Sequence, residues 1–258
     1  SESVYGRGTN LQNIPREPSV RSMFIPDTGY VLVNADLSQA EARLVAYLGR
    51  EERMIAVFES GRDIHTMNAA VIFGCHYNQV TKEQRQVAKS RVHGANYGIV
   101  PAKAAKIAGT TEEKAREDLN RYKAMYPCLE LWWKEVREQV GKTRVMTTPF
   151  GRRRMFFDRW SEDLVREAIA YVPQSTVGDL LNFGIIRCWD ALPIGWELLM
   201  QNHDSVLAQV PEGTDPMHIL KFFKHYFEIP LTIHNRTFKV PIDIKIGKNW
   251  GEMEDLKI

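Results

Sequence analysis

The sequence lacks the features that mark secreted, disulfide-stabilised or membrane-spanning proteins. Its 258 residues include only three cysteines, Cys75, Cys128 and Cys188, whose wide spacing fits neither a disulfide framework nor a cysteine metal site. No apolar run approaches the roughly 20 residues of a membrane-spanning helix, and residues 1–7 do not resemble a signal peptide. We therefore expect a soluble protein of a reducing, cytoplasmic compartment, with no membrane partner.

The chain also lacks repeats, low-complexity segments and a strong net charge. Its formal charge of +2 predicts no partner, and its 44% hydrophobic and 26% charged residues are typical of a globular protein. Positive charge is concentrated locally: residues 82–106 hold six Lys or Arg and one acid, and residues 142–154 hold five and no acid. Such patches suit phosphate groups, although each alone also fits a solvated helix face or a basic turn.

A candidate metal ligand follows a predicted buried strand. Tyr30–Ala35 is an apolar, β-branched run, and Asp36 closes it. Ser38 and Glu41 then have the spacing of a capping box at the start of a helix. Asp36 is therefore expected where a rigid strand ends and a helix begins, which is a suitable place for a metal ligand. Taken alone, Asp36 could equally cap or solvate the turn.

A second candidate ligand lies far along the chain. Residues 198–210 read as two short apolar strands joined by the polar sequence His203-Asp204-Ser205, which predicts a hairpin with an acid at its tip. Magnesium prefers a few carboxylates together with waters and substrate phosphates. Two aspartates at strand ends can hold two such ions, and paired ions stabilise the attacking and leaving oxygens of a phosphoryl transfer.

Motifs along nearly the whole chain resemble, in the same order, those of the family A DNA polymerases, the bacterial DNA polymerase I family. Asp36–Arg43 is similar to the first catalytic motif, Arg85–Gly98 to the fingers-helix motif and His203–Asp204 to the last catalytic motif. Four flanking motifs also match: Asn10–Pro15, Asp63–Thr66, Phe150–Arg154 and Ile246–Trp250.

The resemblance implies an α+β fold in which a small antiparallel sheet of the palm carries the catalytic aspartates and the fingers are mostly helical. It divides the chain into residues 1–50 (palm), 51–141 (fingers, with a nucleotide-binding helix at about 81–97) and 142–258 (palm). Because nine residues precede Asn10, an upstream thumb and any exonuclease domain are expected in a preceding segment of the same polypeptide or in a separate chain. Without a thumb, we expect a weak grip on primer–template DNA.

The implied reaction is template-directed DNA synthesis, in which a primer 3′-hydroxyl attacks a dNTP and pyrophosphate leaves. The family pattern implies two Mg²⁺ ions on Asp36, Asp204 and the backbone carbonyl of Leu37. Arg85 and Lys89 would bind the triphosphate, and Lys89 would donate a proton to pyrophosphate.

The resemblance also implies two sets of binding residues. Glu41 would exclude a ribose 2′-hydroxyl, or act as the capping-box partner of Ser38, or do both. The four-residue spacing from Arg85 to Tyr97 predicts a cationic stripe on one helix that ends in an aromatic ring. The dNTP-binding residues are Gln39, Glu41, His65, Arg85, Lys89, His93 and Tyr97. Those that contact primer–template DNA are Arg7, Asn10, Gln12, Asn13, Arg43, Arg152, Arg153, Arg154, Gln174 and His203.

Two positions depart from the family pattern. His93 stands where the family usually has Phe or Tyr, which affects sugar discrimination, and Ser205 stands where it usually has Glu. One alternative is therefore a catalytically impaired module that binds primer–template DNA. Another is a metal-dependent nuclease, which the cationic stripe and the lack of proofreading motifs argue against.

Three further elements are predicted from apolar patterns. A helix at 128–140 would turn Leu131, Trp132 and Val136 towards a core. A long helix at 161–190 contains Pro173, which predicts a kink or a break. Residues 237–246 alternate like a single edge strand.

Overall fold

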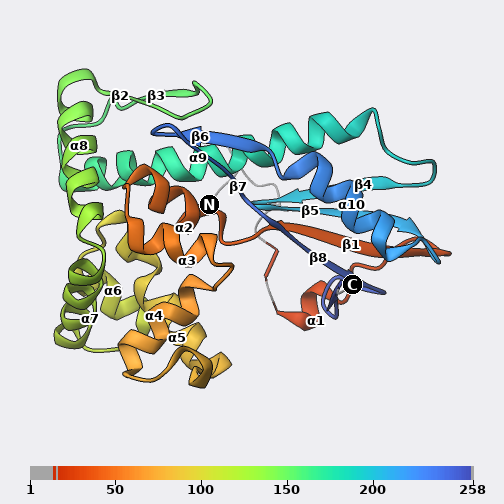
Figure 1. Ribbon diagram of the computed structural model, residues 1–258, viewed down its shortest axis with the longest axis horizontal. Helices are drawn as coiled ribbons and strands as arrows, with labels where there is room; N and C mark the ends of the chain where they lie inside the picture. The colour runs from red at the N-terminus through yellow and green to blue at the C-terminus, as the bar shows by residue number, and fades with distance from the viewer. Residues whose placement is uncertain (1–13, 16, 257–258) are drawn as a thin grey trace. The chain divides into compact units, whose positions relative to one another are not determined.

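The computed structural model describes residues 14–256 except residue 16, without the side chains of residues 91–93 (Figure 1). The chain forms two compact units. Unit 1 comprises residues up to Ala40, Val177–Leu231 and Phe238 onwards, and unit 2 comprises Glu41–Thr176 and Thr232–Thr237. The predicted α+β fold is confirmed, whereas the division into palm and fingers stays a prediction.

Unit 1 is built on a five-stranded antiparallel sheet of order β4-β5-β1-β8-β9. The strands are β1 (Tyr30–Leu37), β4 (Glu197–Asn202), β5 (Ser205–Pro211), β8 (Ile242–Gly247) and β9 (Glu254–Asp255). The predicted hairpin is confirmed as β4 and β5. Asp36 lies inside β1, one residue before its end, and is the register partner of Ser205 on β5.

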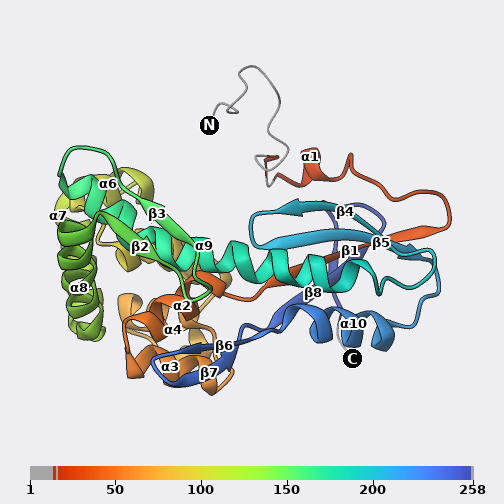
Figure 2. The same cartoon turned by 90° about the horizontal axis from the view of Figure 1, so that it is seen from above.

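One face of this sheet is apolar, because successive side chains of a strand point to opposite faces and the apolar residues fall on one of them. Val33, Ala35 and Leu37 of β1 are fully buried. The helices α9 (Glu162–Trp189) and α10 (Pro216–Phe227) lie beside the sheet (Figure 2). They pack closely, since a Cβ added at Gly184 of α9 would lie 2.4 Å from the ring of Phe227.

The predicted single edge strand at 237–246 is wrong. The segment is split between β7 (Arg236–Lys239), which pairs with β6 (Pro230–Ile233), and β8, which lies inside the main sheet between β1 and β9. Pro241 separates the two strands. It has no N–H to continue a ladder, although its carbonyl accepts a hydrogen bond from the N–H of Ser38 at 2.8 Å.

Unit 2 is mainly helical. In addition to the first part of α9 and the hairpin of β2 (Val145–Thr147) and β3 (Arg153–Met155), it contains α2 (Ala40–Leu48, from Glu41 onwards), α3 (Glu52–Glu59), α4 (Ile64–Phe73), η2 (Tyr77–Gln79), α5 (Lys82–Val92), η3 (His93–Tyr97), α6 (Pro101–Ala108), α7 (Glu112–Met125) and α8 (Pro127–Thr143).

One predicted core position in unit 2 is wrong. Trp132 and Val136 of α8 are buried as expected, but Leu131 is 57% exposed and Leu129 is buried instead. Residues 129, 132 and 136 follow the helical period, and Leu131 falls about 100° away from that stripe.

The predicted long helix at 161–190 is confirmed as α9, which continues through Pro173 without a break, whereas the kink stays a prediction. A second predicted helix has a different course. The helix expected to carry Arg85 to Tyr97 ends at Val92, and residues 93–97 form the 3₁₀ helix η3. A four-residue step turns by about 120° in a 3₁₀ helix, against about 40° in an α-helix, so Tyr97 leaves the predicted stripe.

Candidate active site

Unit 1 brings the two predicted metal-binding aspartates to one end of the sheet. The N–H of Leu37 donates a hydrogen bond to the carbonyl of Asp204 at 2.9 Å, so the end of β1 lies against the turn between β4 and β5. His203 occupies that turn with a left-handed φ of 54° and an exposed side chain. Asp36, Leu37, His203 and Asp204 are therefore neighbours.

Polar residues form a row across the sheet beside these aspartates. Asn202, Ser205, Asp36 and Asp243 occupy register-matched positions on β4, β5, β1 and β8, and therefore share one face. The hydroxyl of Ser205 donates to the carbonyl of Asn202 at 3.0 Å, and both residues are buried. Asp243 is exposed and was not predicted, because its position opposite Asp36 depends on strand pairing that the sequence does not reveal.

The donor set suits magnesium. Asp36 and Asp204 offer hard carboxylate oxygens, and Mg²⁺ usually takes one or two carboxylates together with waters and substrate phosphates. Within residues 14–256, apart from residue 16, no group of three or more His, Cys, Asp or Glu could hold a metal ion. A pair of acids completed by substrate is consistent with Mg²⁺ and not with an all-protein zinc or calcium site.

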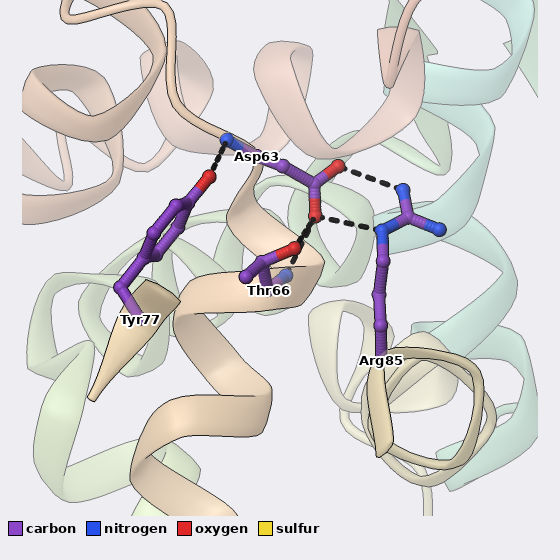
Figure 3. Close-up of polar contacts among 4 residues, drawn as sticks. All are labelled: Asp63, Thr66, Tyr77 and Arg85. Carbon is purple, nitrogen blue, oxygen red and sulfur yellow. Dashed lines mark hydrogen bonds and ion pairs between the residues drawn. The ribbon is translucent and has the colours of Figure 1, made fainter. Parts of the chain in front are cut away.

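Unit 2 holds the predicted triphosphate ligand Arg85 in a bidentate ion pair with Asp63 (Figure 3). The Nε of Arg85 donates to Oδ1 of Asp63 at 3.0 Å, and Nη2 donates to Oδ2 at 2.7 Å. Asp63 also caps α4, since its Oδ1 accepts hydrogen bonds from the N–H and the hydroxyl of Thr66 at 2.6 and 2.8 Å. The sequence places Asp63 only in the flanking motif Asp63–Thr66 and predicts no contact with Arg85.

These contacts determine the protonation of the pair. Burial favours the neutral acid, but the hydrogen bonds from Arg85 and Thr66 outweigh it and lower the pKa of Asp63 from 3.8 to about 2. The hydrogen bond to Asp63 raises the pKa of Arg85. Both groups are therefore charged at neutral pH.

The other predicted phosphate ligands lie on the same two helices. Lys89 follows Arg85 by one turn of α5 and is half-buried. His65 is in the first turn of α4, two residues after Asp63.

Unit 2 also brings together Tyr97, Glu41 and Gln174. The hydroxyl of Tyr97 donates a hydrogen bond to Oε2 of Glu41 and also interacts with the side chain of Gln174. Burial and the nearby Glu41 carboxylate raise the pKa of Tyr97, so its hydroxyl remains a donor. The helix α2 begins at Ala40, two residues after Ser38, and the capping box of Ser38 and Glu41 stays a prediction.

The remaining predicted DNA and dNTP contacts have mixed placements. Arg43 is buried, and its guanidinium lies 4.6 Å from the ring centroid of Phe58, which favours a supporting role. Gln39 has a left-handed φ of 51° before α2. Arg152, Arg153 and Arg154 are exposed near β3, and Arg154 forms an ion pair with Glu167 at 2.9 Å. Outside the described structure lie Arg7, Asn10, Gln12, Asn13 and the side chain of His93.

Comparison with known proteins decides the family. The family model described as DNA polymerase family A matches residues 6–252. The chain belongs to DNA polymerase family A. This family A chain is 32% identical over 263 residues to DNA polymerase I of Chloroflexus aurantiacus, covering 96% of this chain and 27% of that protein. It is 30% identical over 254 residues to the thermostable DNA polymerase I of Thermus aquaticus, covering 93% of this chain and 30% of that protein.

The fold is similar to a solved structure described as the POL domain of Pol1 from M. smegmatis in complex with DNA primer-template and dNTP. The TM-score is 0.82 with 26% sequence identity, and the match covers 95% of this family A chain and 45% of that chain. The chain thus spans less than a third of the length of the curated relatives described here. No helix among the described residues is both long and apolar enough to cross a membrane.

Proposed function

We propose that this chain carries the catalytic centre of a template-directed DNA polymerase, which adds dNTPs to a primer 3′-hydroxyl and releases pyrophosphate. The observation that carries the proposal is the hydrogen bond from Leu37 to Asp204, which joins the strand of Asp36 to the turn of Asp204 in a family A chain. This hydrogen bond brings together the chain segments of Asp36 and Asp204, which belong to motifs far apart in the sequence.

Each unit supplies a different part of the proposed reaction. In unit 1, Asp36, Asp204 and the carbonyl of Leu37 would hold Mg²⁺. When bound, two Mg²⁺ ions would favour ionisation of the primer hydroxyl and offset negative charge as the phosphoryl group is transferred. His203 and Asp204 share a tight turn, which presents the acid at the end of the hairpin.

In unit 2, Arg85 and Lys89 would bind the triphosphate of the incoming nucleotide, with His65 beside them. Lys89 would also protonate the leaving pyrophosphate. Glu41, oriented by Tyr97, would disfavour a ribose 2′-hydroxyl. The exposed Arg152–Arg154 and Gln174 would contact primer–template DNA, as charged and amide side chains commonly do.

Single-nucleotide extension tests this function against its alternatives. Four primed duplexes that differ only in the templating base are incubated with Mg²⁺ and one dNTP at a time. The proposal predicts incorporation of the complementary nucleotide and one pyrophosphate released per addition. Binding of the duplexes without extension would contradict it and favour the impaired binding module. Shortening of the DNA without extension would favour the nuclease.

A further inference from the structure

Asp63 has no role in the proposed chemistry, yet it makes a bidentate contact with Arg85, 22 residues away on another helix. A carboxylate facing a triphosphate-binding arginine can act in two opposite ways. It can compete with the anionic nucleotide for the guanidinium, or it can orient the guanidinium towards the nucleotide. The contacts of the two side chains distinguish these possibilities.

Asp63 occupies only some of the hydrogen-bond donors of the Arg85 guanidinium. It has five N–H donors, and Asp63 accepts from Nε and from one N–H of Nη2. The two N–H groups of Nη1 and the second N–H of Nη2 point along other edges of the planar fork. Arg85 can therefore contact Asp63 and a phosphate at the same time, which a single-point cation such as lysine does less readily.

Asp63 is the anchored partner of the two. Its carboxylate accepts two hydrogen bonds from Thr66, and its backbone N–H donates to the hydroxyl of Tyr77 at 3.0 Å (Figure 3). Its side chain is 24% exposed, against 37% for the longer side chain of Arg85. The fixed carboxylate thus determines where the flexible cation lies.

We propose that Asp63 is a positioning residue, which holds the guanidinium of Arg85 in place so that its remaining donors bind the triphosphate. The same residue caps α4, whose first turn carries His65, so one carboxylate sets the positions of two predicted phosphate ligands. This inference rests on the proposed function, because it takes Arg85 as a triphosphate ligand.

Asp63→Asn is the informative variant. Asparagine caps helices about as well as aspartate, so α4 should keep its start. It lacks the charge and the second acceptor oxygen that hold the guanidinium. Glu162→Gln is the matched control, because it removes the other described bidentate carboxylate partner in unit 2, that of Arg137, and neither of these residues is a predicted ligand.

The test is calorimetric titration of the 258-residue chain with Mg²⁺-tripolyphosphate, together with KM and kcat for dNTP. We expect Asp63→Asn to weaken tripolyphosphate binding and raise KM by about tenfold, with a smaller change in kcat, and Glu162→Gln to change neither. In an Arg85→Ala background, Asp63→Asn should have no further effect, because its influence passes through Arg85.

Other results would overturn the proposal. Tighter binding of tripolyphosphate by Asp63→Asn would show that Asp63 competes with the phosphates for Arg85. Unchanged binding would show that Asp63 acts only as the cap of α4. A full effect in the Arg85→Ala background would show that Asp63 acts through α4. If the unmutated chain binds tripolyphosphate and extends primers, such results refute the positioning role alone. If it does neither, the proposed function fails and this inference fails with it.

Discussion

The hydroxyl of Tyr97 donates a hydrogen bond to the carboxylate of Glu41 and so joins the end of η3 to the first turn of α2. The two residues lie 56 positions apart in separate motifs, and both are predicted nucleotide ligands. Glu41 is thereby held in one orientation. A fixed carboxylate can exclude a ribose 2′-hydroxyl more sharply than a freely rotating one.

Tyr97→Phe should destabilise unit 2 by about 1–2 kcal/mol, because a half-buried carboxylate loses its hydrogen-bond donor. Tyr47→Phe is the matched control: its hydroxyl donates to Glu59 over a longer distance of 3.3 Å, so its loss should be smaller. Urea unfolding measures both changes in the free energy of unfolding. Equal losses of unfolding free energy in the two variants would show that the hydrogen bond to Glu41 stabilises the chain no more than the one to Glu59.

The Asp63–Arg85 pair should make stability depend on pH in the acid range. The pKa of Asp63 is lowered from 3.8 to about 2 in the folded chain, so its contribution is present above about pH 4 and is lost as the pH falls towards 2. Compared with Asp63→Asn, the unmutated chain should be more stable at pH 6 by about 2 kcal/mol. This difference should vanish near pH 2 in denaturant titrations. A stability difference between the two chains that grows as the pH falls would contradict this prediction.

The facing acids Asp36 and Asp243 should be unfavourable without a cation, since like charges directly across a ladder repel. In EDTA, Asp243→Asn should raise the free energy of unfolding by about 0.5 kcal/mol. Mg²⁺ should stabilise the unmutated chain by ligand binding to the folded state. Thermal unfolding with and without Mg²⁺ measures both effects.

Asp255→Asn is the control for Asp243→Asn, because Asp255 is an exposed acid of the same sheet that pairs with Lys245 at 3.7 Å. It should not gain stability in EDTA. Lower stability of Asp243→Asn in EDTA would show that Asp243 makes a favourable contact there, and the repulsion argument would be wrong.

Gly184→Ala should destabilise unit 1 by about 1–3 kcal/mol, because its Cβ would lie 2.4 Å from the ring of Phe227. Gly178→Ala is the control in the same helix: nothing lies within 4 Å of its Cβ, and alanine is the better helix former by up to about 1 kcal/mol. Guanidinium unfolding of both variants should give changes of opposite sign. A stable Gly184→Ala variant would mean that α9 and α10 can move apart.

The sequence predicts best where a pattern is local. The run from Tyr30 and the hairpin tip at Asp204 depend on neighbours within a few residues, and the structure has both. The stripe from Arg85 to Tyr97 assumed one uninterrupted α-helix, and the change to a 3₁₀ helix at His93 disrupted it.

Contacts between distant segments could not be predicted in this way. The alternation around Asp243 indicates a polar face, but nothing local places β8 beside β1 or opposite Asp36. Asp63 has the sequence of a helix cap, and its second role appears only when α5 brings Arg85 within 3.0 Å. Resemblance to the family predicted the ligands, whereas the residues that contact them required the fold.

Asp36 and Asp204 are proposed to act together in phosphoryl transfer. The most direct measurement is the single-turnover rate of nucleotide addition by the unmutated chain, Asp36→Asn, Asp204→Asn, the double variant and the Asp255→Asn control. We expect each single variant to lose at least about a thousandfold in rate, the double variant to be hardly slower than either, and the control to be unchanged. Nucleotide addition by either single variant at close to the unmutated rate would contradict it.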